Sequence, residues 1–144
     1  MPLSTDIKTE IRNLLESLTK NETLREVIVD DFKMGIFDRD YGRFPVAIIT
    51  TPSIEGEYFT DHQNMRIHTF EIVVLQKGEN ITSADEIETL VETILDKFDT
   101  NETLAGKAMQ VEPASTVPQA VTSRGKNYVA FSVLIKAKAV KALA

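Results

Sequence analysis

The 144-residue sequence contains no cysteine and no extended apolar segment. Without cysteine the chain has no disulfide bonds, no thiolate metal ligands and no cysteine nucleophile. Its longest apolar runs are four residues, against the roughly 20 that a membrane-spanning helix needs. No apolar segment follows a basic start as it does in a secretory signal. We therefore expect a protein that is made inside the cell and has no membrane partner.

The signatures of common enzyme sites are also missing. No glycine-rich loop stands where a strand passes into a helix, so neither of the usual phosphate-binding fingerprints is present. Serines such as Ser53, Ser115 and Ser132 lack the flanking glycines of a nucleophile elbow. The two histidines, His62 and His68, could share a metal only if the segment between them folded back. The sequence thus predicts no enzyme activity, no cofactor and no metal.

What the sequence does contain is an ordinary globular composition, with 42% hydrophobic and 26% charged residues. That balance, with this length, predicts one domain covering residues 1–144. The net charge of −6 is unevenly spread: the balance is −2 over residues 1–50, −9 over 51–106 and +5 over 107–144. The acidic and basic parts could face each other within one subunit, or they could meet head to tail between subunits and generate a ring.

Two amphipathic helices are predicted, over residues 4–20 and 83–99. Apolar residues recur in each at the three- and four-residue spacing of one buried stripe: Ile7, Ile11, Leu14, Leu15 and Leu18 in the first, and Ile87, Leu90, Val91, Ile94, Leu95 and Phe98 in the second. The other positions of the second helix are mainly acidic. Its outer face is therefore predicted to be solvated and negative.

Strands are predicted at residues 24–32, 46–51, 65–76 and 128–140. The last is the clearest, because Val129, Phe131, Val133, Ile135 and Ala137 alternate along it. The polar residues 53–64 are too many for a tight turn, so the strands around them are expected to continue into a projecting β-arm or long loop at about 52–66. Residues 108–121 are interrupted by Pro113 and Pro118, which predicts an edge strand or an irregular loop.

Arginines and aromatic residues alternate in the loop at 34–45, which contains Phe37, Arg39, Tyr41, Arg43 and Phe44. Such a mixture can stack on nucleobases. It can equally be a packed loop whose aromatic rings close one end of the core. The second interpretation is favoured because two aspartates in the same loop would repel phosphate, and no sequence-specific nucleic-acid binding is expected.

These elements together predict an α+β fold. We expect a two-layer sandwich with a mainly antiparallel sheet of four to five strands, because strands adjacent in sequence usually pair, and two helices packed on one face.

Several segments, taken in order, resemble the tail terminator (tail completion) family of long-tailed bacteriophages. The likeness spans roughly residues 5–140. It rests on the N-terminal amphipathic helix and on five stretches: Arg43-Phe-Pro-Val-Ala-Ile-Ile49, Glu57-Tyr-Phe-Thr60, Arg66-Ile-His-Thr-Phe-Glu-Ile-Val-Val74, Leu95-Asp-Lys-Phe-Asp-Thr-Asn-Glu-Thr-Leu-Ala-Gly106 and Asn127-Tyr-Val-Ala-Phe-Ser-Val-Leu-Ile-Lys136.

The resemblance implies a structural virion protein with no catalytic residues. Members of the family form a homo-hexameric ring on the head-proximal end of the tail tube, stop its polymerisation and offer a surface for head attachment. The implied partners are further copies of this chain, the tail tube protein and a head-tail connector or neck protein. The implied location is the virion tail, and DNA could pass through the ring lumen.

Thirteen residues are candidates for protein interfaces, chosen because they lie in the arm, on the acidic helix or in the basic C-terminal third: Glu55, Glu57, Tyr58, Phe59, Asp61, Arg66, Glu88, Glu92, Asp99, Arg124, Lys126, Lys136 and Lys138. Two other interpretations remain open. One is a neck, head-closure or other minor tail protein of similar fold. The other is a non-viral α+β module that binds a protein partner through the arm.

Overall fold

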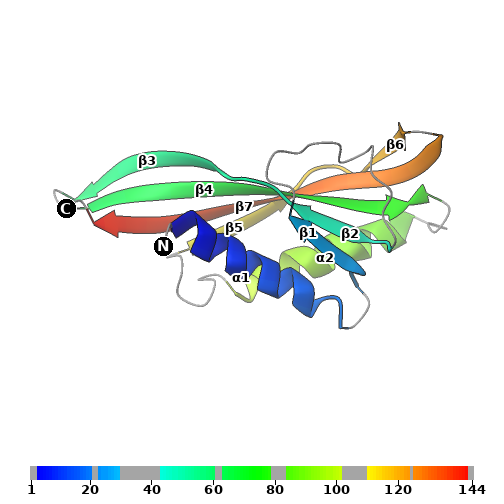
Figure 1. Ribbon diagram of the computed structural model, residues 1–144, viewed down its shortest axis with the longest axis horizontal. Coiled ribbons are helices and arrows are strands. Elements are labelled where there is room, and N and C mark those ends of the chain that lie inside the picture. Colours follow the sequence, from blue (N-terminus) through cyan, green and yellow to red (C-terminus); the bar gives the residue numbers. More distant parts are fainter. Residues whose placement is uncertain are drawn as a thin grey trace.

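The computed structural model describes residues 3–20, 23–29, 43–60, 63–78, 84–101, 110–123 and 125–142. Its elements in chain order are α1 (Leu3–Ser17), β1 (Glu26–Val29), β2 (Val46–Ile49), β3 (Ser53–Thr60), β4 (Gln63–Lys77), α2 (Ala84–Asp99), β5 (Gln110–Ser115), β6 (Gln119–Ser123) and β7 (Lys126–Ala142). Both predicted helices are present. Figure 1 shows them on one side of a long sheet.

Two long antiparallel strands, β4 and β7, form the axis of the sheet. They pair from Gln63 opposite Ala142 to Lys77 opposite Tyr128. The outer edge of β4 carries β2 and then β3, and the outer edge of β7 carries β5 and then β6. Each long strand is therefore flanked by two shorter ones, and β1 adds to β2 at the margin.

The expected sheet of four to five mainly antiparallel strands is wrong in strand number and in pairing, although the α+β class is correct. The structure has a seven-stranded mixed sheet. Strands β1 and β2 pair in parallel, with Glu26 opposite Val46, and the chain between them is longer than the dozen or so residues that a parallel connection needs. The strands also do not all pair with their neighbours in the sequence, as a meander would require. β4 pairs directly with β7, although a helix and two short strands lie between them in the sequence.

Prolines account for the limits of the short strands. Pro52 lies between β2 and β3, and Pro118 lies between β5 and β6, where the lost N–H donor breaks the ladder. Pro113 is tolerated inside β5, opposite Ile135, because β5 ends the sheet order on that side. At the β6–β7 turn, Gly125 has a φ of 76°, a conformation that glycine adopts without steric cost.

The main core lies between the helices and one face of the sheet. It joins Ile7, Ile11 and Leu15 of α1 and the α2 stripe to alternate residues of β4 and β7, such as Phe70 and Val133. This arrangement confirms the helical periodicities and the predicted inward face of the last strand. A second, smaller cluster on the opposite face contains Val46, Ile48, Val73 and Leu75.

Three strands lie side by side where residues 52–66 were expected to form an arm. β3 pairs with β4 from Ser53 opposite Thr69 to Thr60 opposite Gln63, with an irregularity between Tyr58 and Thr60, so only residues 61–62 connect them. The far end of β7 lies along the other side of β4. Figure 1 shows these three strands continuing past the N-terminal end of α1.

Candidate protein-interaction surfaces

The outer side of α2 carries an unbroken line of carboxylates. Its inner stripe is buried, with Ile94 and Phe98 fully inaccessible, so the residues between must face solvent. Spacings of three and four place five acidic residues along one line of the helix, and all five are exposed: Asp85, Glu88, Glu92, Asp96 and Asp99. We call this line the carboxylate row. It contains the three predicted interface residues of this helix, Glu88, Glu92 and Asp99.

The carboxylate row is costly for an isolated helix. Like charges four residues apart destabilise a helix by about 0.2–0.5 kcal/mol per pair. The ion pairs found elsewhere, Arg12 with Glu16 and Lys138 with Glu112, do not involve the row. Its charge is thus available to attract a cationic partner.

The predicted basic residues Lys136 and Lys138 lie on β7, on the sheet face opposite the helices. Their neighbours on β7, Ile135 and Ala137, belong to the main core, so the lysines point to the other side. Lys138 Nζ lies 3.1 Å from Glu112 Oε1, and Glu112 is opposite Lys136 in the β5–β7 register. One carboxylate therefore compensates part of this positive charge within the subunit.

The remaining predicted interface residues are distributed over the arm and the β6–β7 turn. Glu55 is exposed on β3, whose sequence also includes Glu57, Tyr58 and Phe59. Lys126 is the first residue of β7. Asp61 and Arg124 lie outside the described residues.

Arg66, the last of the candidates, lies opposite Gly56 on the strand that also carries His68. Two-residue spacing puts Arg66 and His68 on the same face of β4, where His68 is only 1% exposed. Burial lowers the pKa of His68, and the positive charge of Arg66 lowers it further. His62 is outside the described residues, within which no cluster of three metal-binding side chains occurs.

Phe44 supports the packed-loop interpretation for its own part of the 34–45 segment. Its ring lies 5.8 Å from that of Tyr128, and Lys77 Nζ is 5.7 Å from its centroid. Tyr128 is itself 4% exposed. This aromatic residue is therefore engaged at the edge of the second cluster, whereas Phe37, Arg39 and Tyr41 lie outside the described residues.

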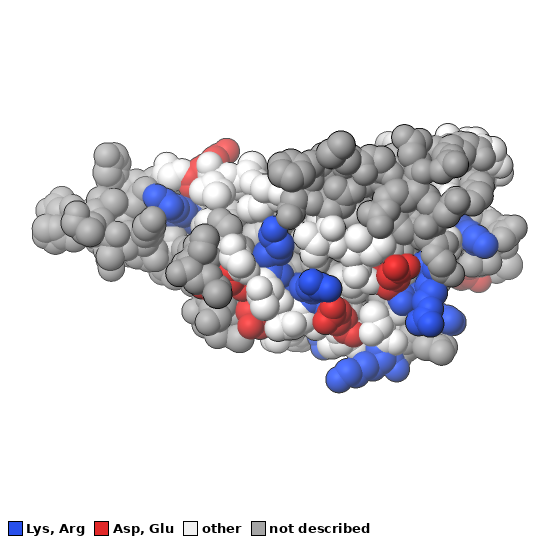
Figure 2. All heavy atoms as spheres, viewed as in Figure 1, with Lys and Arg blue, Asp and Glu red and all other residues white. Residues whose placement is uncertain are grey.

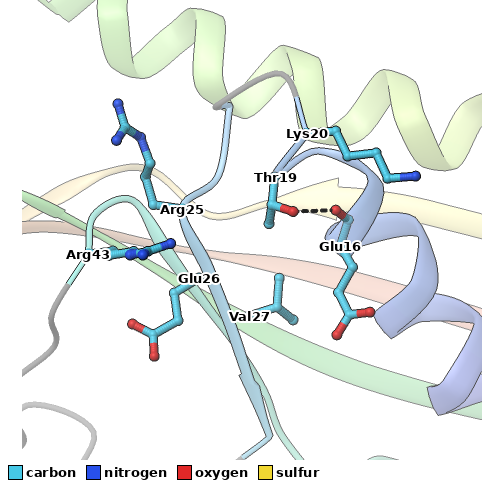
Figure 3. Close-up of a pocket in the computed structure, with 7 residues that line it drawn as sticks. All are labelled: Glu16, Thr19, Lys20, Arg25, Glu26, Val27 and Arg43. Atoms are coloured by element: carbon cyan, nitrogen blue, oxygen red, sulfur yellow. Dashed lines mark hydrogen bonds between the residues drawn. The ribbon is translucent and has the colours of Figure 1, made fainter.

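Sequence reasoning missed a pocket of about 530 Å³ between the end of α1 and the start of β1. Figure 3 shows Lys20 on the helix side of this pocket, with Arg25 and Arg43 on the strand side. The lining residues are Glu16, Thr19, Lys20, Arg25, Glu26, Val27 and Arg43. Because they come from three separate segments, no local motif could have indicated that their charges meet.

Backbone contacts hold the three segments of this pocket together. The Arg25 amide donates to the Pro45 carbonyl over 2.8 Å, and the Leu24 amide donates to the Leu18 carbonyl over 3.2 Å. Leu24 and Leu18 are both buried in the main core. The start of β1 is thereby tied both to the end of α1 and to the residues preceding β2.

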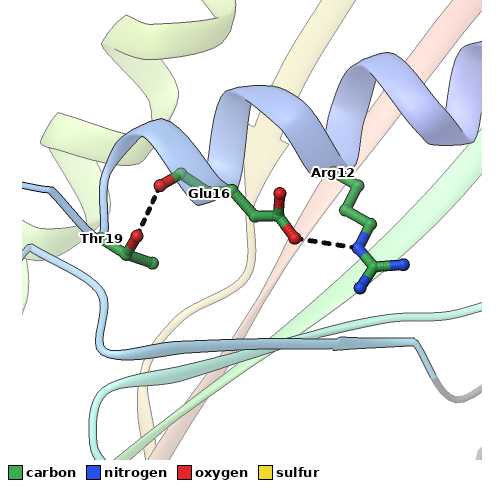
Figure 4. Close-up of polar contacts among 3 residues, drawn as sticks. All are labelled: Arg12, Glu16 and Thr19. Carbon is green, nitrogen blue, oxygen red and sulfur yellow. Dashed lines mark hydrogen bonds and ion pairs between the residues drawn. The ribbon is translucent and has the colours of Figure 1, made fainter.

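The pocket is lined by three basic side chains and two carboxylates, and one of these carboxylates, Glu16, has its partner within α1. Its Oε1 accepts a hydrogen bond from Arg12 Nε over 3.0 Å, one turn back along α1, and its carbonyl accepts from Thr19 Oγ1 over 2.6 Å (Figure 4). The basic residues of the lining are Lys20, Arg25 and Arg43, and Glu26 is the second carboxylate. Figure 2 shows Lys and Arg side chains around the end of α1, with Asp and Glu side chains between them. Such a pocket can bind an anionic group.

Comparison with known proteins does not assign a family: no protein-family model matches the chain, and no curated protein matches its sequence. In the part of the chain that the structure describes, no helix is long and apolar enough to cross a membrane.

Proposed function

We propose that the protein is a tail terminator, a structural virion protein that caps the head-proximal end of a phage tail tube as a ring. The observation that carries this proposal is the separation of charge on one subunit. The carboxylate row is exposed on α2, while the basic residues Lys20, Arg25 and Arg43 line a pocket between the end of α1 and the start of β1. Surfaces of opposite charge at different places on a subunit favour a head-to-tail contact, and repeated head-to-tail contacts generate a ring when the rotation between subunits closes.

The three-stranded arm supplies a surface for a second kind of partner. Ile54 of β3 is 51% exposed, so the strand offers an apolar side chain beside the exposed Glu55. We infer that the arm contacts the tail tube protein, with Glu55, Tyr58 and Phe59 in the contacting strand. A head-tail connector or neck protein would bind the opposite end of the ring.

The negative charge of the subunit is also compatible with a ring through which DNA passes. The net charge is −6, and carboxylates facing a lumen would repel phosphate and let DNA pass without binding. The proposed ring thus needs neither a cofactor nor a catalytic residue.

The decisive experiment is electron microscopy of tails assembled with and without the protein. Overlong tails in its absence, and rings on the upper tube end in its presence, are expected. Tails of normal length with unattached heads would instead support a neck or head-closure role. A protein that stays monomeric at high concentration, even with tail tube present, would contradict both virion roles and favour a partner-binding module that uses the arm.

A further inference from the structure

The two margins of the sheet, β1 on one side and the β5–β6 segment on the other, lie at the same level along the strands. Paired residues form an unbroken row from one margin to the other: Glu26, Val46, Leu75, Ala130 and Gln119. A second row starts at the other end of β1: Val29, Ile49, Ile72, Val133 and Ser115. β1 therefore stands level with residues 115–119 of the opposite margin.

The β1 margin has the composition of a strand from the interior of a sheet. Val27 and Val29 pack against the main core, whereas Ile28 packs against the second cluster on the opposite face. Apolar side chains on both faces are typical of strands that are buried within a sheet. Among the described strands, however, β1 pairs with β2 alone. Its outer edge therefore has no strand partner within the described residues.

The β5–β6 margin lacks the charges that commonly protect a sheet edge. Residues 113–123 contain no charged side chain, although charges on an edge strand hinder its pairing with other chains. Val117, in this uncharged stretch, is 77% exposed. The edge of the arm is different, because the sequence of β3 includes Glu55 and Glu57. Among the described strands β5 and β6 pair with β7 alone, so their outer edge can accept a further strand.

We propose that β1 of one subunit adds to the β5–β6 margin of a second copy of this chain, so that the sheet continues from subunit to subunit and Val117 is covered. This inference rests on the proposed ring and specifies its subunit contact. The two margins are different surfaces, so the contact is heterologous and generates a ring when the rotation between subunits closes.

The directions of the strands fit this contact. β1 is parallel to β2, which is antiparallel to β4. β4 is antiparallel to β7, and β7 is antiparallel to β5 and β6, so β1 runs opposite to β5 and β6. A rotation about an axis along the strands leaves these directions unchanged. The two margins then meet as an antiparallel pair, which is the more stable arrangement per residue. Pro118 donates no backbone hydrogen bond, so the burial of Val117 supplements a short ladder.

Cysteine cross-linking tests the contact, because the chain has no cysteine of its own. Within one subunit Glu26 and Gln119 are four strand spacings apart, or about 19 Å. A bismaleimide shorter than this distance can therefore join them only between subunits. The double variant Glu26→Cys/Gln119→Cys is expected to give a ladder of covalent multimers on denaturing gels.

The two single variants are the controls. Glu26→Cys alone and Gln119→Cys alone should stay at the size of one chain, whereas their equimolar mixture should give covalent dimers. Dimers from either single variant would indicate a two-fold contact and overturn the inference. An assembled double variant that gives no covalent products would overturn it as well.

A substitution at Val117 tests the same contact without cross-linking. Val117→Lys should leave the fold unchanged, because the side chain is 77% exposed, but should weaken self-association at least about tenfold, because the contact loses a buried valine. Light scattering after size exclusion measures this loss. The matched control is Ile54→Lys, at an apolar side chain that is 51% exposed on the arm, and it should assemble as the wild type does. Loss of assembly in Ile54→Lys but not in Val117→Lys would overturn the inference.

Three further outcomes separate this contact from the proposed function. Rings that form without the covalent ladder would overturn the contact and leave the terminator role intact. A ladder from a protein that does not limit tail length would support the contact and contradict the terminator role. A wild type that stays monomeric, with or without tail tube, would overturn both.

Discussion

The two faces of the sheet differ in what covers them. On one face the helices bury a continuous apolar core that reaches from Ile7 to Ala139. On the other, the buried cluster of Val46, Ile48, Val73 and Leu75 lies near β1 and β2, and Tyr128 is buried at its edge. Beyond them the second face is polar and half-exposed, with Ser132 Oγ donating to Glu71 Oε2 over 2.9 Å and Lys138 paired with Glu112. The first face supplies the stability of the fold, whereas the second is compatible with contact to other molecules.

The largest difference between the faces is expected from truncating apolar side chains. Phe98→Ala should lower the free energy of unfolding by about 3–5 kcal/mol, because Phe98 is fully buried and its loss leaves a cavity. Leu134→Ala on the second face, where Leu134 is only half-buried, should cost less than about 1 kcal/mol. Urea unfolding of both variants measures this difference. Equal losses would show that the second face is covered as fully as the first.

The small cluster on the second face should have an intermediate sensitivity. Leu75 is fully buried beside Val46 and Ile48, but the cluster is smaller than the main core and can relax around a truncated side chain. Leu75→Ala is therefore expected to cost about 2–3 kcal/mol, near the lower end for such changes. A decrease in the free energy of unfolding larger than that of Phe98→Ala, measured in the same urea titration, would show that the second face contributes more to stability than the first.

The pH dependence of the free energy of unfolding tests the environment of His68, which lies on the face of β4 that is turned toward the helices. Burial and Arg66 lower the pKa of His68 in the folded protein below its ordinary value of 6.5. Above pH 6.5 both folded and unfolded chains carry neutral His68. As the pH falls below 6.5, the unfolded chain takes up a proton that the folded chain does not, so stability decreases by at most about 1.4 kcal/mol per pH unit.

This loss should continue down to the lowered folded-state pKa. The matched variant is His68→Gln, which should show a smaller slope between pH 6.5 and 5, measured by thermal unfolding across the range. Identical slopes in the two proteins would mean that His68 titrates normally when folded.

The smallest expected effect is at the ion pair of the second face. The side chains of Lys138 and Glu112 are 30% and 47% exposed, so water screens their attraction. Lys138→Ala should change the free energy of unfolding by no more than about 0.5 kcal/mol, and the change should fall further in high salt. A loss above about 1 kcal/mol in thermal unfolding would show that this pair contributes to the core rather than to the surface.

Helices and buried positions could be predicted from the sequence, because their signal is local. The spacing of Ile87, Leu90 and Ile94 defines one helical face whatever the helix packs against, and these residues are buried. The alternation along β7 likewise identified the residues that face the helices, including Phe131 and Val133. The interface residues stay predictions, which the proposed assembly experiments address.

Strand neighbours and the pocket between α1 and β1 could not be predicted in the same way. The parallel pairing of β1 with β2 joins segments that are far apart in the sequence, with Glu26 opposite Val46, and no residue within β1 encodes it. The pairing of Lys138 with Glu112 joins residues 26 positions apart. The pocket brings Lys20, Arg25 and Arg43 together only because the ends of α1, β1 and β2 converge.

By itself, the sequence determined the helices, the apolar side of each element and the acidic outer face of α2, since side-chain periodicity depends on neighbouring residues alone. Only the tertiary structure decided that seven strands form one mixed sheet. It also decided which charges are compensated within the chain and which are left exposed. The physical reason is that hydrogen-bonded strand pairing and charge proximity are non-local, so they depend on how the whole chain packs.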